Sequence, residues 1–412
     1  LCFLKESTGK VRKMDDGLVR TLSIGLSQRG VRDHNERLLL SLIQRHDSLP
    51  GSDLAKIAGL SPPTVSGILR QLEADGLIER GDPVRGKVGK PSVPKRLAAN
   101  GAFAFGIKIG RRSADLMLMD FRGGTKGQLK VTYDYPVFQT VLAFIADGLA
   151  QLSASLSDDE RNRICGIGVA APFELWNWEA PKNAPASSFV SWKDVDITAE
   201  IAKFSDLPVV QMNDATAACQ AEHTYGRGKE FQDYAYFYIG AFIGGGVVLN
   251  NSVYIGRQGN AGALGSLRSI SPIGESMQLV DMASIHQLEA RLREVDIDTR
   301  QLWDDPTSWT KLSRYVEPWL LQTAQELAKA SLSICSVIDF EAILIDGSFP
   351  ASLREDLVNR VRRYVATQDT RGLIPPKIEA GIIGGNARAQ GAACEPIRAQ
   401  FFLNANTGRG AS

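Results

Sequence analysis

The stretch "GSDLAKIAGLSPPTVSGILRQLEADG", residues 51–76, constrains the fold most, because it predicts two amphipathic helices joined by a short turn. The first helix has Ser52 as its expected N-cap and Gly59 near its end. The second has Ser61 as its N-cap and Pro62 at the first helical position. Its inner face carries apolar residues at helical spacing, namely Val65, Ile68, Leu69 and Leu72. Two helices joined in this way predict a helix-turn-helix.

The residues on both sides of this pair extend it to a winged helix-turn-helix. Upstream, from Asp33, apolar residues at helical spacing predict a further amphipathic helix, namely Leu38, Leu39, Leu42 and Ile43. Downstream, "LIERGDPVRGKVGKPSVPKRL" indicates strand, turn and strand, with three cations in the turn, Arg85, Lys87 and Lys90. We therefore expect a DNA-binding domain over residues 31–98, preceded by an N-terminal arm over 1–30.

The outer face of the second helix of the pair has chemistry suited to double-stranded DNA. Small residues near its N-terminal end let the backbone approach base edges and phosphates, while Arg70 and the wing cations would neutralise phosphates or enter a minor groove. Residues 1–96 hold 17 Lys and Arg against 11 Asp and Glu, whereas the remainder holds 30 against 35. The predicted DNA-binding residues are Ser61, Pro63, Thr64, Ser66, Gly67, Arg70, Arg85, Lys87 and Lys90. The alternative is a three-helix packing domain that binds no DNA.

Length and composition argue against several other classes of protein. With 412 residues the chain is too long for one ordinary core. No apolar run approaches the roughly 18 residues that span a bilayer, and the N-terminal stretch is too weakly apolar for a signal peptide. The five cysteines and four histidines lie far apart, which indicates neither a zinc site nor a disulfide framework. We expect a cytoplasmic protein with reduced thiols, no metal and no membrane partner.

After Leu97 the pattern changes to strands alternating with helices. Residues 105–124, "FGIKIGRRSADLMLMDFRGG", predict a β-hairpin with a tight turn near Gly110. Residues 234–256, "YAYFYIGAFIGGGVVLNNSVYIG", predict a second hairpin with a glycine-rich turn. Two hairpins of this kind indicate a duplicated α/β plan.

From about residue 31 the whole chain resembles the ROK family (repressors, open reading frames and kinases), and most closely its repressor branch. The matching stretches include "GLSPPTVSGILRQLEADGLI", "GIGVAAP", "KNAPASSFVSW", "MNDATAACQAE", "GAFIGGGVVLNNSVYIGRQGNAGALG" and "GGNARAQGAA". The resemblance implies an α/β protein in which a winged helix-turn-helix precedes an actin-like ATPase (ribonuclease H-like) two-lobed sugar-kinase fold. The sugar-kinase-like body would cover 99–412, with one lobe of roughly 99–213 plus the C-terminal helix and the other of 214–385.

The resemblance also implies what a ROK kinase requires. In the family, the Asp of an "ND" pair is the catalytic base and the Asn helps to position the sugar, and Asn213 and Asp214 hold those positions here. The first phosphate-binding hairpin has Lys108 where the family has Asp, and Arg111 and Arg112 where it has small residues. A lysine cannot organise Mg²⁺, and two arginines remove the room that a triphosphate needs.

The other ligand-binding stretches of the family are altered too. Phe242 replaces a glycine in the second phosphate-binding hairpin. The family's "AGEIGH" becomes "AGALGS" at 261–266, so Ala263 replaces the Glu that grips the sugar and Ser266 replaces the His that binds sugar and zinc. We expect no catalytic residue, no cofactor and no metal, although Asp214 keeps the position of the base.

These observations predict a DNA-binding transcriptional regulator, a repressor of carbohydrate uptake or catabolism genes, which binds its operator as a homodimer or homotetramer. Asn183, Asn213 and Asp214 would bind a small carbohydrate effector, unless Asn213 and Asp214 serve only as a helix N-cap. Arg111 and Arg112 would either receive an anion such as a sugar phosphate or be solvated. Two other functions stay open: a ROK sugar kinase that retains ATP-dependent phosphotransfer, and a ligand-independent dimeric DNA-binding regulator.

Overall fold

A computed structural model describes the N-terminal domain and most of the body. The described residues are 28–83, 93–172, 192–193, 195–270 and 274–403. Four predicted site residues therefore lie outside the described residues, namely Arg85, Lys87, Lys90 and Asn183. Within the described part of the chain, no helix is long and apolar enough to cross a bilayer.

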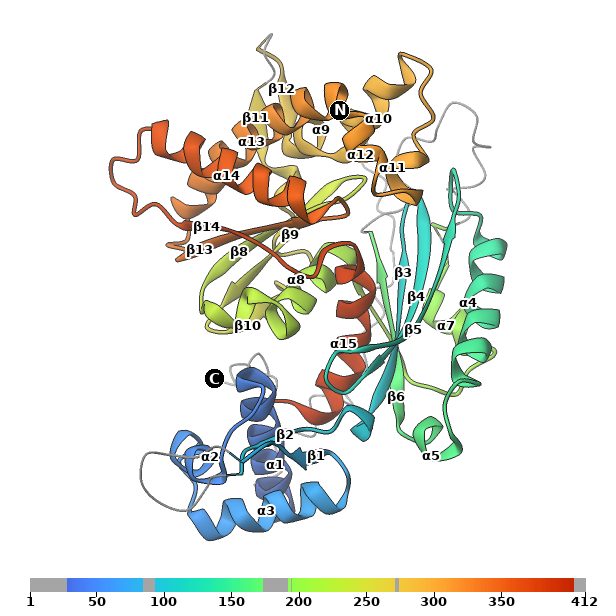
Figure 1. The fold of residues 1–412 in the computed structure, drawn as a ribbon, viewed down its shortest axis with the longest axis vertical. Coiled ribbons are helices and arrows are strands. Elements are labelled where there is room, and N and C mark those ends of the chain that lie inside the picture. Colours follow the sequence, from blue (N-terminus) through green and yellow to red (C-terminus); the bar gives the residue numbers. More distant parts are fainter. Residues whose placement is uncertain (1–27, 84–92, 173–191, 194, 271–273, 404–412) are drawn as a thin grey trace, which may run out of the picture.

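Three helices and a two-stranded antiparallel sheet form the N-terminal domain, as the sequence predicts (Figure 1). Its elements are α1 (Gln28–His46), α2 (Gly51–Ala58), α3 (Pro62–Ala74), β1 (Ile78–Arg80) and β2 (Lys95–Leu97). All the elements contribute buried apolar residues to one core, among them Leu39, Ile43, Leu54, Val65, Leu69, Leu72, Ile78 and Leu97. The predicted inner face of α3 is thus the buried face.

Local sequence determines where α2 and α3 begin and end. The prediction of Ser52 as the N-cap of α2 is wrong, because the helix begins after Pro50 and has no side-chain cap. Gly59 ends α2 with a φ of 67°, a left-handed conformation that glycine adopts without steric cost. Ser61 caps α3 as predicted, because its hydroxyl accepts a hydrogen bond of 3.3 Å from the backbone N–H of Thr64.

The body contains two five-stranded sheets with the same strand order, one in each lobe. The first lobe has the order β5-β4-β3-β6-β7, and the second has β10-β9-β8-β13-β14. Each sheet combines an antiparallel meander of three strands with two further strands parallel to the first strand of that meander. The repeated order confirms the duplicated α/β plan. The strands are β3 (Phe103–Ile109), β4 (Ser113–Asp120), β5 (Thr125–Thr132), β6 (Ile164–Ala171), β7 (Val209–Asn213), β8 (Tyr234–Ile239), β9 (Ile243–Leu249), β10 (Ser252–Tyr254), β13 (Ala342–Gly347) and β14 (Lys377–Ala380).

Helices cover the outer face of each sheet, and a pair of helices lies between the lobes (Figure 1). The first lobe has α4 (Phe138–Ser153), α5 (Asp158–Arg161) and α7 (Ile197–Ile201). The second lobe has α9 (Leu279–Ala283), α10 (Ile285–Arg293), α11 (Gln301–Asp304), α12 (Ser308–Lys311), α13 (Ser313–Cys335) and α14 (Ala351–Thr367), with a small hairpin of β11 (Arg268–Ile270) and β12 (Ser276–Gln278). The central pair is α8 (Asp214–Tyr225) and α15 (Ala387–Phe401). Short 3-10 helices are η2 (Ala99–Gly101), η4 (Arg227–Glu230), η5 (Leu264–Ser266) and η6 (Gly384–Asn386).

Glycines allow the central pair of helices to pack closely. A Cβ on Gly106 of β3 would lie 1.9 Å from the carbonyl oxygen of Ala389, so α15 sits directly on the first-lobe sheet. A Cβ on Gly391 would lie 1.7 Å from the carbonyl oxygen of Ala217, so α15 and α8 touch through their backbones. Any larger side chain at these glycines would push the helices apart.

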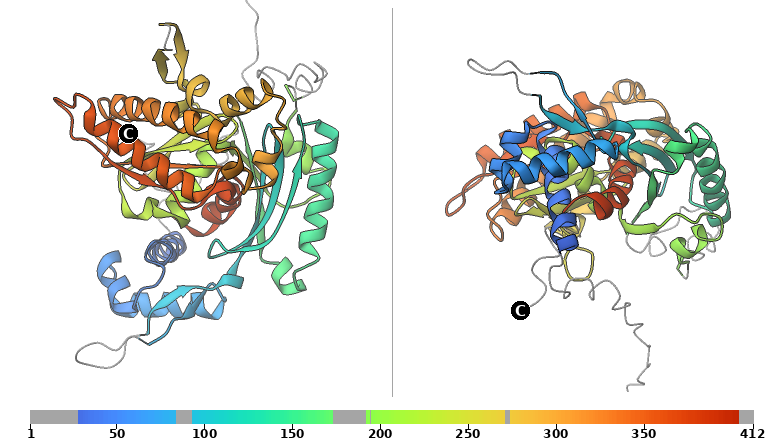
Figure 2. Two further views of the ribbon diagram at one scale, coloured as in Figure 1. Left: turned by 45° about the horizontal axis from the view of Figure 1, so that its top comes forward. Right: turned by 90° about the horizontal axis from the view of Figure 1, so that it is seen from below.

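The N-terminal domain shares its hydrophobic core with the body. The core extends from α1 to the C-terminal end of α15, where Phe402 stacks on Phe121 with ring centroids 5.7 Å apart. The side-chain amide of Gln44 donates a 2.6 Å hydrogen bond to the carbonyl oxygen of Thr224, near the end of α8. Both central helices therefore reach from between the lobes to the N-terminal domain, which lies at one end of the molecule (Figure 2).

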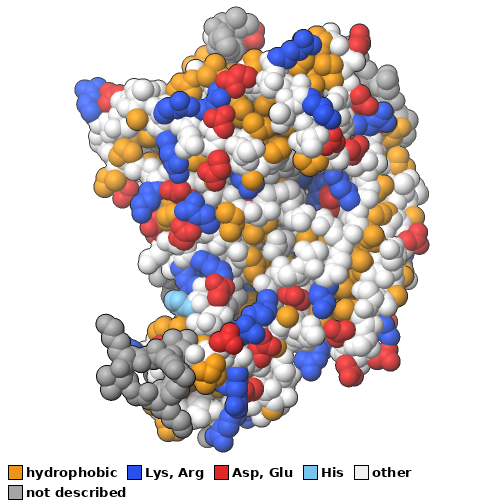
Figure 3. Space-filling model, in the orientation of Figure 1, with side chains coloured by type: hydrophobic (Ala, Val, Ile, Leu, Met, Phe, Trp, Pro, Cys, Tyr) orange, Lys and Arg blue, Asp and Glu red, His pale blue; other side chains and the backbone are white. Residues whose placement is uncertain are grey.

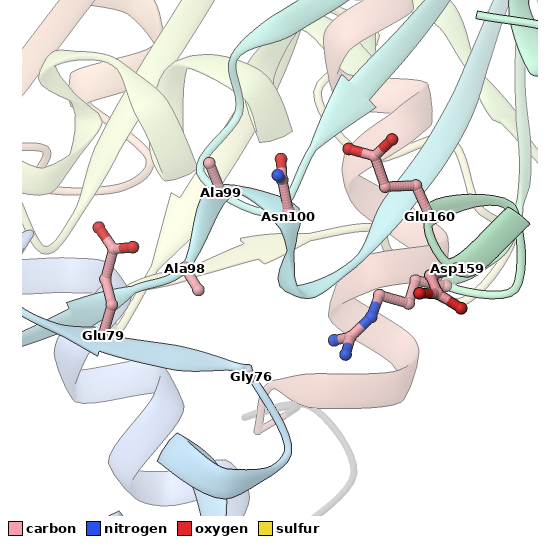
Figure 4. A pocket seen from close by; sticks show the side chains of 8 residues that line it. Gly76, Glu79, Ala98, Ala99, Asn100, Asp159 and Glu160 are labelled. Carbon is pink, nitrogen blue, oxygen red and sulfur yellow. The ribbon is translucent and has the colours of Figure 1, made fainter. Parts of the chain in front are cut away.

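A pocket of about 370 Å³ lies where the N-terminal domain meets the first lobe (Figure 4). Arg163 crosses this junction by donating hydrogen bonds to the carbonyl oxygens of Asp75, at 3.1 Å, and Gly101, at 3.4 Å. The lining residues are Gly76, Glu79, Ala98, Ala99, Asn100, Asp159, Glu160 and Arg163. Arg163 of the first lobe thus braces the junction between the N-terminal domain and the body.

Candidate functional site

The outer face of α3 is exposed, at the end of the molecule farthest from the lobes (Figure 1). Every described residue that the sequence assigns to DNA binding is exposed, namely Ser61, Pro63, Thr64, Ser66, Gly67 and Arg70. The apolar residues of the opposite face are all buried. Among the described residues, this face is therefore open on the side away from the lobes.

Gly67 lies in the interior of α3, where glycine is unfavourable. A Cβ built on it would meet no atom within 4 Å, and its backbone is helical. Neither packing nor backbone conformation therefore requires glycine at this position, although alanine would favour the helix by about 1 kcal/mol. A glycine in such a place leaves room for a partner outside the chain to approach the helix backbone.

Ion pairs connect α3 to both strands of the wing. Glu73 accepts hydrogen bonds from Lys95 of β2, at 2.9 Å, and from Arg80 of β1, at 2.6 Å. The hydrogen bond from Lys95, assisted by Arg80 and by both positive charges, lowers the pKa of Glu73 despite some burial. The side chain of Arg70 folds back to the carbonyl oxygen of Ser66, at 3.3 Å, and remains exposed. These ion pairs thus join the helix to the base of the wing.

Asn213 and Asp214 lie at the junction of β7 and α8. Asn213 is the N-cap of α8, because its side-chain oxygen accepts hydrogen bonds from the N–H groups of Ala215, at 3.0 Å, and Thr216, at 3.2 Å. Asp214 follows as the first helical residue and accepts a hydrogen bond of 3.3 Å from Arg388 of α15. Asn213 thus caps α8, whereas the Asp214 carboxylate makes an ion pair between the two central helices.

Asp214 belongs to a group of polar side chains between the lobes, which we call the interlobe cluster. Its members are Lys108, Ser113, Asp115, Asp214, Ser348 and Arg388. Lys108 donates to the carbonyl and hydroxyl oxygens of Ser113, at 3.0 and 2.6 Å, and to Asp115, at 2.9 Å. Burial lowers the pKa of Lys108 to about 8, although the negative charge of Asp115 opposes that shift. Lys108 thus stays in place by internal hydrogen bonds.

Arg388 is the central donor of the interlobe cluster. Besides Asp214, it donates to the hydroxyl of Ser348 at 3.3 Å, and its guanidinium lies 5.0 Å from the ring centroid of Tyr238. Its Nε is buried and has no hydrogen-bond partner among the described residues. Two cations, two carboxylates and two hydroxyls together offer donors and acceptors suited to a polyhydroxylated ligand.

The two hairpin turns that the resemblance assigns to phosphate binding face each other and are occupied by side chains. The guanidinium of Arg111 lies 5.1 Å from the ring centroid of Phe242. Arg112 donates two hydrogen bonds to the carboxylate of Glu289 in α10, at 3.1 and 3.0 Å. Arg111 is 9% exposed and the Arg112 side chain 13% exposed. The expectation that these arginines are solvated is wrong, because they contact the second lobe.

The stretch at 261–266 does not rebuild the lost sugar and zinc ligands. Ala263 and Ser266 are exposed, and Leu264 between them is buried in the second-lobe core. Gly262 has a φ of 77°, and a Cβ on it would lie 2.6 Å from the Cα of Gly246. No cluster of His, Cys, Asp or Glu suited to a metal ion occurs among the residues that the structure describes.

Sequence reasoning missed two residues that organise the region between the lobes. Arg388 lies within "GGNARAQGAA", but nothing local indicates that it pairs with Asp214, 174 positions away. Glu289 pairs with Arg112 across 177 positions. A buried arginine or glutamate next to apolar helix residues is the only local signal, and it does not name a partner.

The sequence matches the ROK family over residues 104–394 and a winged helix-turn-helix DNA-binding family over residues 32–79. An uncharacterised protein, y4fQ, of Sinorhizobium fredii is 26% identical over 381 residues, which cover 90% of this chain and 92% of that protein. The DNA-binding transcriptional dual regulator NagC of Escherichia coli is 24% identical over 247 residues, which cover 60% of this chain and 59% of NagC. The xylose repressor of Bacillus subtilis is 23% identical over 237 residues, which cover 58% of this chain and 61% of that repressor. The matches to these two regulators thus span about three fifths of each regulator's length.

Solved structures share the fold. A ROK family transcriptional regulator, described as a homologue of the Escherichia coli MLC protein, superposes with a TM-score of 0.60 at 20% identity, covering 90% of this chain and 96% of that one. A ROK family glucokinase from Streptomyces griseus, solved with glucose and AMPPNP, superposes with a TM-score of 0.55 at 19% identity. The superposition covers 71% of this chain and 99% of the glucokinase. Since the family match includes well over half of the sequence, this chain belongs to the ROK family, with a winged helix-turn-helix domain in front of the family's two-lobed body.

Proposed function

We propose that this protein is a sequence-specific DNA-binding transcriptional regulator, a repressor of carbohydrate uptake or catabolism genes. The observation that carries the proposal is the exposed outer face of α3, with small residues, an unconstrained Gly67 and Arg70. The relatedness of this chain to a transcriptional dual regulator and to a xylose repressor supports the same function.

The outer face of α3 would enter the major groove. The hydroxyls of Ser61 and Thr64 lie at its N-terminal end, where backbone N–H groups and the helix dipole favour phosphate. Ser66 and Gly67 bring the backbone close to base edges, and Arg70 neutralises a phosphate. Pro63 and the wing residues Arg85, Lys87 and Lys90 remain predicted contacts. Figure 3 shows cationic and anionic side chains intermixed over the lobes, so the face shown there offers no large cationic surface to compete with α3.

We propose that the body does not transfer phosphate. Phosphoryl transfer needs a carboxylate that organises Mg²⁺ and backbone amides that contact the phosphates. Lys108 replaces the carboxylate and is held by Ser113 and Asp115. Arg112 occupies the turn where phosphates would lie and is paired with Glu289.

The interlobe cluster is the proposed effector site. Asp214 and the unpartnered Nε of Arg388 would hydrogen-bond carbohydrate hydroxyls, together with Asn213 and Asn183. A ligand that competes for Asp214 would change the contact between the first turns of α8 and α15. The opposite ends of both helices contact the N-terminal domain, so a shift there would change how α3 meets DNA.

We propose a homodimer or homotetramer that acts in the cytoplasm, where the operator DNA is. A single winged helix contacts too few base pairs for operator affinity, and two linked copies multiply affinity without new contacts.

The first experiment is genome-wide immunoprecipitation of the tagged full-length protein, followed by titration of the recovered DNA with purified protein. Arg70→Ala should weaken binding and reduce the slope of log affinity against log salt by about 0.9, as expected for one lost phosphate contact. Arg363→Ala is the matched control, since Arg363 is an exposed helical arginine on α14, far from α3. Sites beside carbohydrate genes support the proposal, and no enrichment over background would contradict it.

The effector is tested separately by calorimetry with a panel of neutral sugars and sugar phosphates. Heat of binding that is lost in Asp214→Asn supports sensing through the interlobe cluster. No heat with any member of the panel would favour the ligand-independent regulator. Steady ATP-dependent phosphorylation of a hexose, abolished by Asp214→Asn, would instead establish a kinase.

A further inference from the structure

The first-lobe hairpin between β3 and β4 contacts the second lobe through two adjacent arginines. Arg111 lies over the ring of Phe242, in the turn between β8 and β9. Arg112 pairs with both carboxylate oxygens of Glu289 in α10. Glu289 is 1% exposed, so this ion pair is shielded from water. We call Arg111, Arg112, Phe242 and Glu289 the latch.

The first lobe holds the arginine side of the latch in position. The hydroxyl of Tyr133 donates to the carbonyl oxygen of Gly110 at 2.7 Å, and the N–H of Tyr133 donates to that of Arg112 at 3.1 Å. Arg112 also donates to the carbonyl oxygen of Asp134 at 3.0 Å. The first lobe thus fixes the backbone of the turn and one nitrogen of the Arg112 guanidinium before Arg112 meets the second lobe.

Hydrogen bonds within the second lobe hold Phe242 and Glu289 in position. The first N–H groups of α10, from Ile285 and His286, donate to the carbonyl oxygens of Gly240 and Ala241, at 3.1 and 3.0 Å. The turn that carries Phe242 and the helix that carries Glu289 are thus joined. The carboxylate of Glu289 also accepts hydrogen bonds from Arg293 and Trp303 within its own lobe, both at 2.8 Å.

A further contact between the lobes lies beside the latch. Lys130 of β5 donates a 3.0 Å hydrogen bond to the carbonyl oxygen of Trp303, whose indole N–H is the donor to Glu289. Glu289 therefore accepts hydrogen bonds both from Arg112 of the first lobe and from Trp303, the residue that Lys130 reaches. Every one of these contacts joins residues of this chain and needs no ligand.

We propose that the latch holds the two lobes together in the ligand-free protein, and that the lobes separate only when the Arg112–Glu289 ion pair breaks. The turn that serves phosphate in related kinases would then serve as a built-in closing contact. Effector entry to the interlobe cluster would require this contact to open, which gives the regulator a defined resting state. The inference concerns the proposed sensing body, but it does not depend on DNA binding.

The test measures the distance between the lobes with spin labels on the full-length chain. Labels are attached to cysteines introduced at Gln151 of α4 and Glu355 of α14, both exposed and one on each lobe. The background carries Cys2→Ser and Cys165→Ser, because the other three cysteines are buried. Arg112→Gln should increase the population at longer distances roughly tenfold or more, since a doubly hydrogen-bonded ion pair is lost.

Two further variants decide whether the effect belongs to the latch. Arg360→Gln is the matched control, because Arg360 also donates two hydrogen bonds to a glutamate, Glu317, at 2.7 and 2.9 Å, but within the second lobe. It should leave the distance distribution unchanged. Arg112→Lys keeps the charge but loses the paired geometry, and it should give an intermediate shift.

The fold of the second lobe should survive Arg112→Gln, because Arg293 and Trp303 still satisfy Glu289. A distribution for Arg112→Gln that matches the unsubstituted protein would overturn the proposal. So would an equal shift in Arg360→Gln, because the change would then reflect general loosening. The measurement uses no DNA, so failure of the latch and failure of the proposed DNA-binding function are distinguished.

Discussion

Replacing Gly67 by alanine should change two measurable quantities in opposite directions. The residue lies in the interior of α3, on its exposed face, and nothing in the chain fills the space beside it. If the glycine is present for DNA, the protein should become more stable and bind DNA less tightly. A residue with only a structural role would not separate stability from affinity in this way.

The size of each change follows from the surroundings of Gly67. Alanine is favoured over glycine in a helix interior by about 1 kcal/mol, and the new methyl group meets no atom within 4 Å, so no strain offsets the gain. The free energy of opening α3 should therefore rise by about 1 kcal/mol. On the duplex, one displaced backbone or side-chain contact is worth about 1–3 kcal/mol, which corresponds to a loss of roughly tenfold or more in affinity.

Two assays on the same preparation measure these changes. Amide hydrogen exchange of α3 reports the stability of the helix, and fluorescence anisotropy with a labelled operator reports affinity at fixed salt. Gly385→Ala is the matched control, because a Cβ there also meets no atom within 4 Å, and Gly385 is exposed in the body. The control should leave operator affinity unchanged.

The reasoning fails if Gly67→Ala binds the operator as tightly as the unsubstituted protein does. In that case the backbone of α3 does not approach DNA closely at this residue. It also fails if the substitution slows no amide exchange in α3. In that case the glycine does not lower the stability of α3 in the protein without DNA.

Three further substitutions test other parts of the molecule. Ser61→Ala removes the cap of α3 and should destabilise the helix by about 0.5–1 kcal/mol by hydrogen exchange, whereas Ser61→Asn should restore it. Asp214→Asn should abolish carbohydrate binding in calorimetry while circular dichroism stays unchanged, because Asn213 still caps α8. Burial acts to raise the pKa of Glu289, but the nearby imidazole of His286, the charge of Arg112 and the hydrogen bonds from Arg112 and Trp303 outweigh it and lower that pKa to about 2, against an ordinary 4.5. The stability that Glu289 contributes is thus complete above pH 4.5 and lost as the pH falls toward 2, so denaturation midpoints of the unsubstituted protein and Glu289→Gln should converge over that window.

Local patterns predicted the helices of the N-terminal domain and both hairpins of the body. The apolar spacing in α3 identifies its buried face residue by residue, because a short helix has only one face that can pack. The prediction for Ser52 failed because the N-cap of α2 is Pro50, two residues earlier, so that Ser52 lies inside the helix.

The ion pairs of the site could not be predicted, because their partners are brought together only by the tertiary fold. Arg112 resembles any turn arginine until α10 places Glu289 beside it. Asp214 likewise gains Arg388 only because α8 and α15 pack at glycine and alanine. Sequence patterns indicate which residues can carry charge in a core, but the three-dimensional neighbours decide whether that charge is paired.

The core shared by α1 and α15 has a consequence for how the protein melts. Because Phe402 and its neighbours complete the interior of the winged helix-turn-helix, neither part can unfold without exposing apolar surface of the other. Calorimetry of the full chain should show the DNA-binding domain and the first lobe absorbing heat in a single transition, whereas separately folding domains would give two. The DNA-binding domain is therefore no interchangeable module: transplanted onto another body, it would lack part of its own interior.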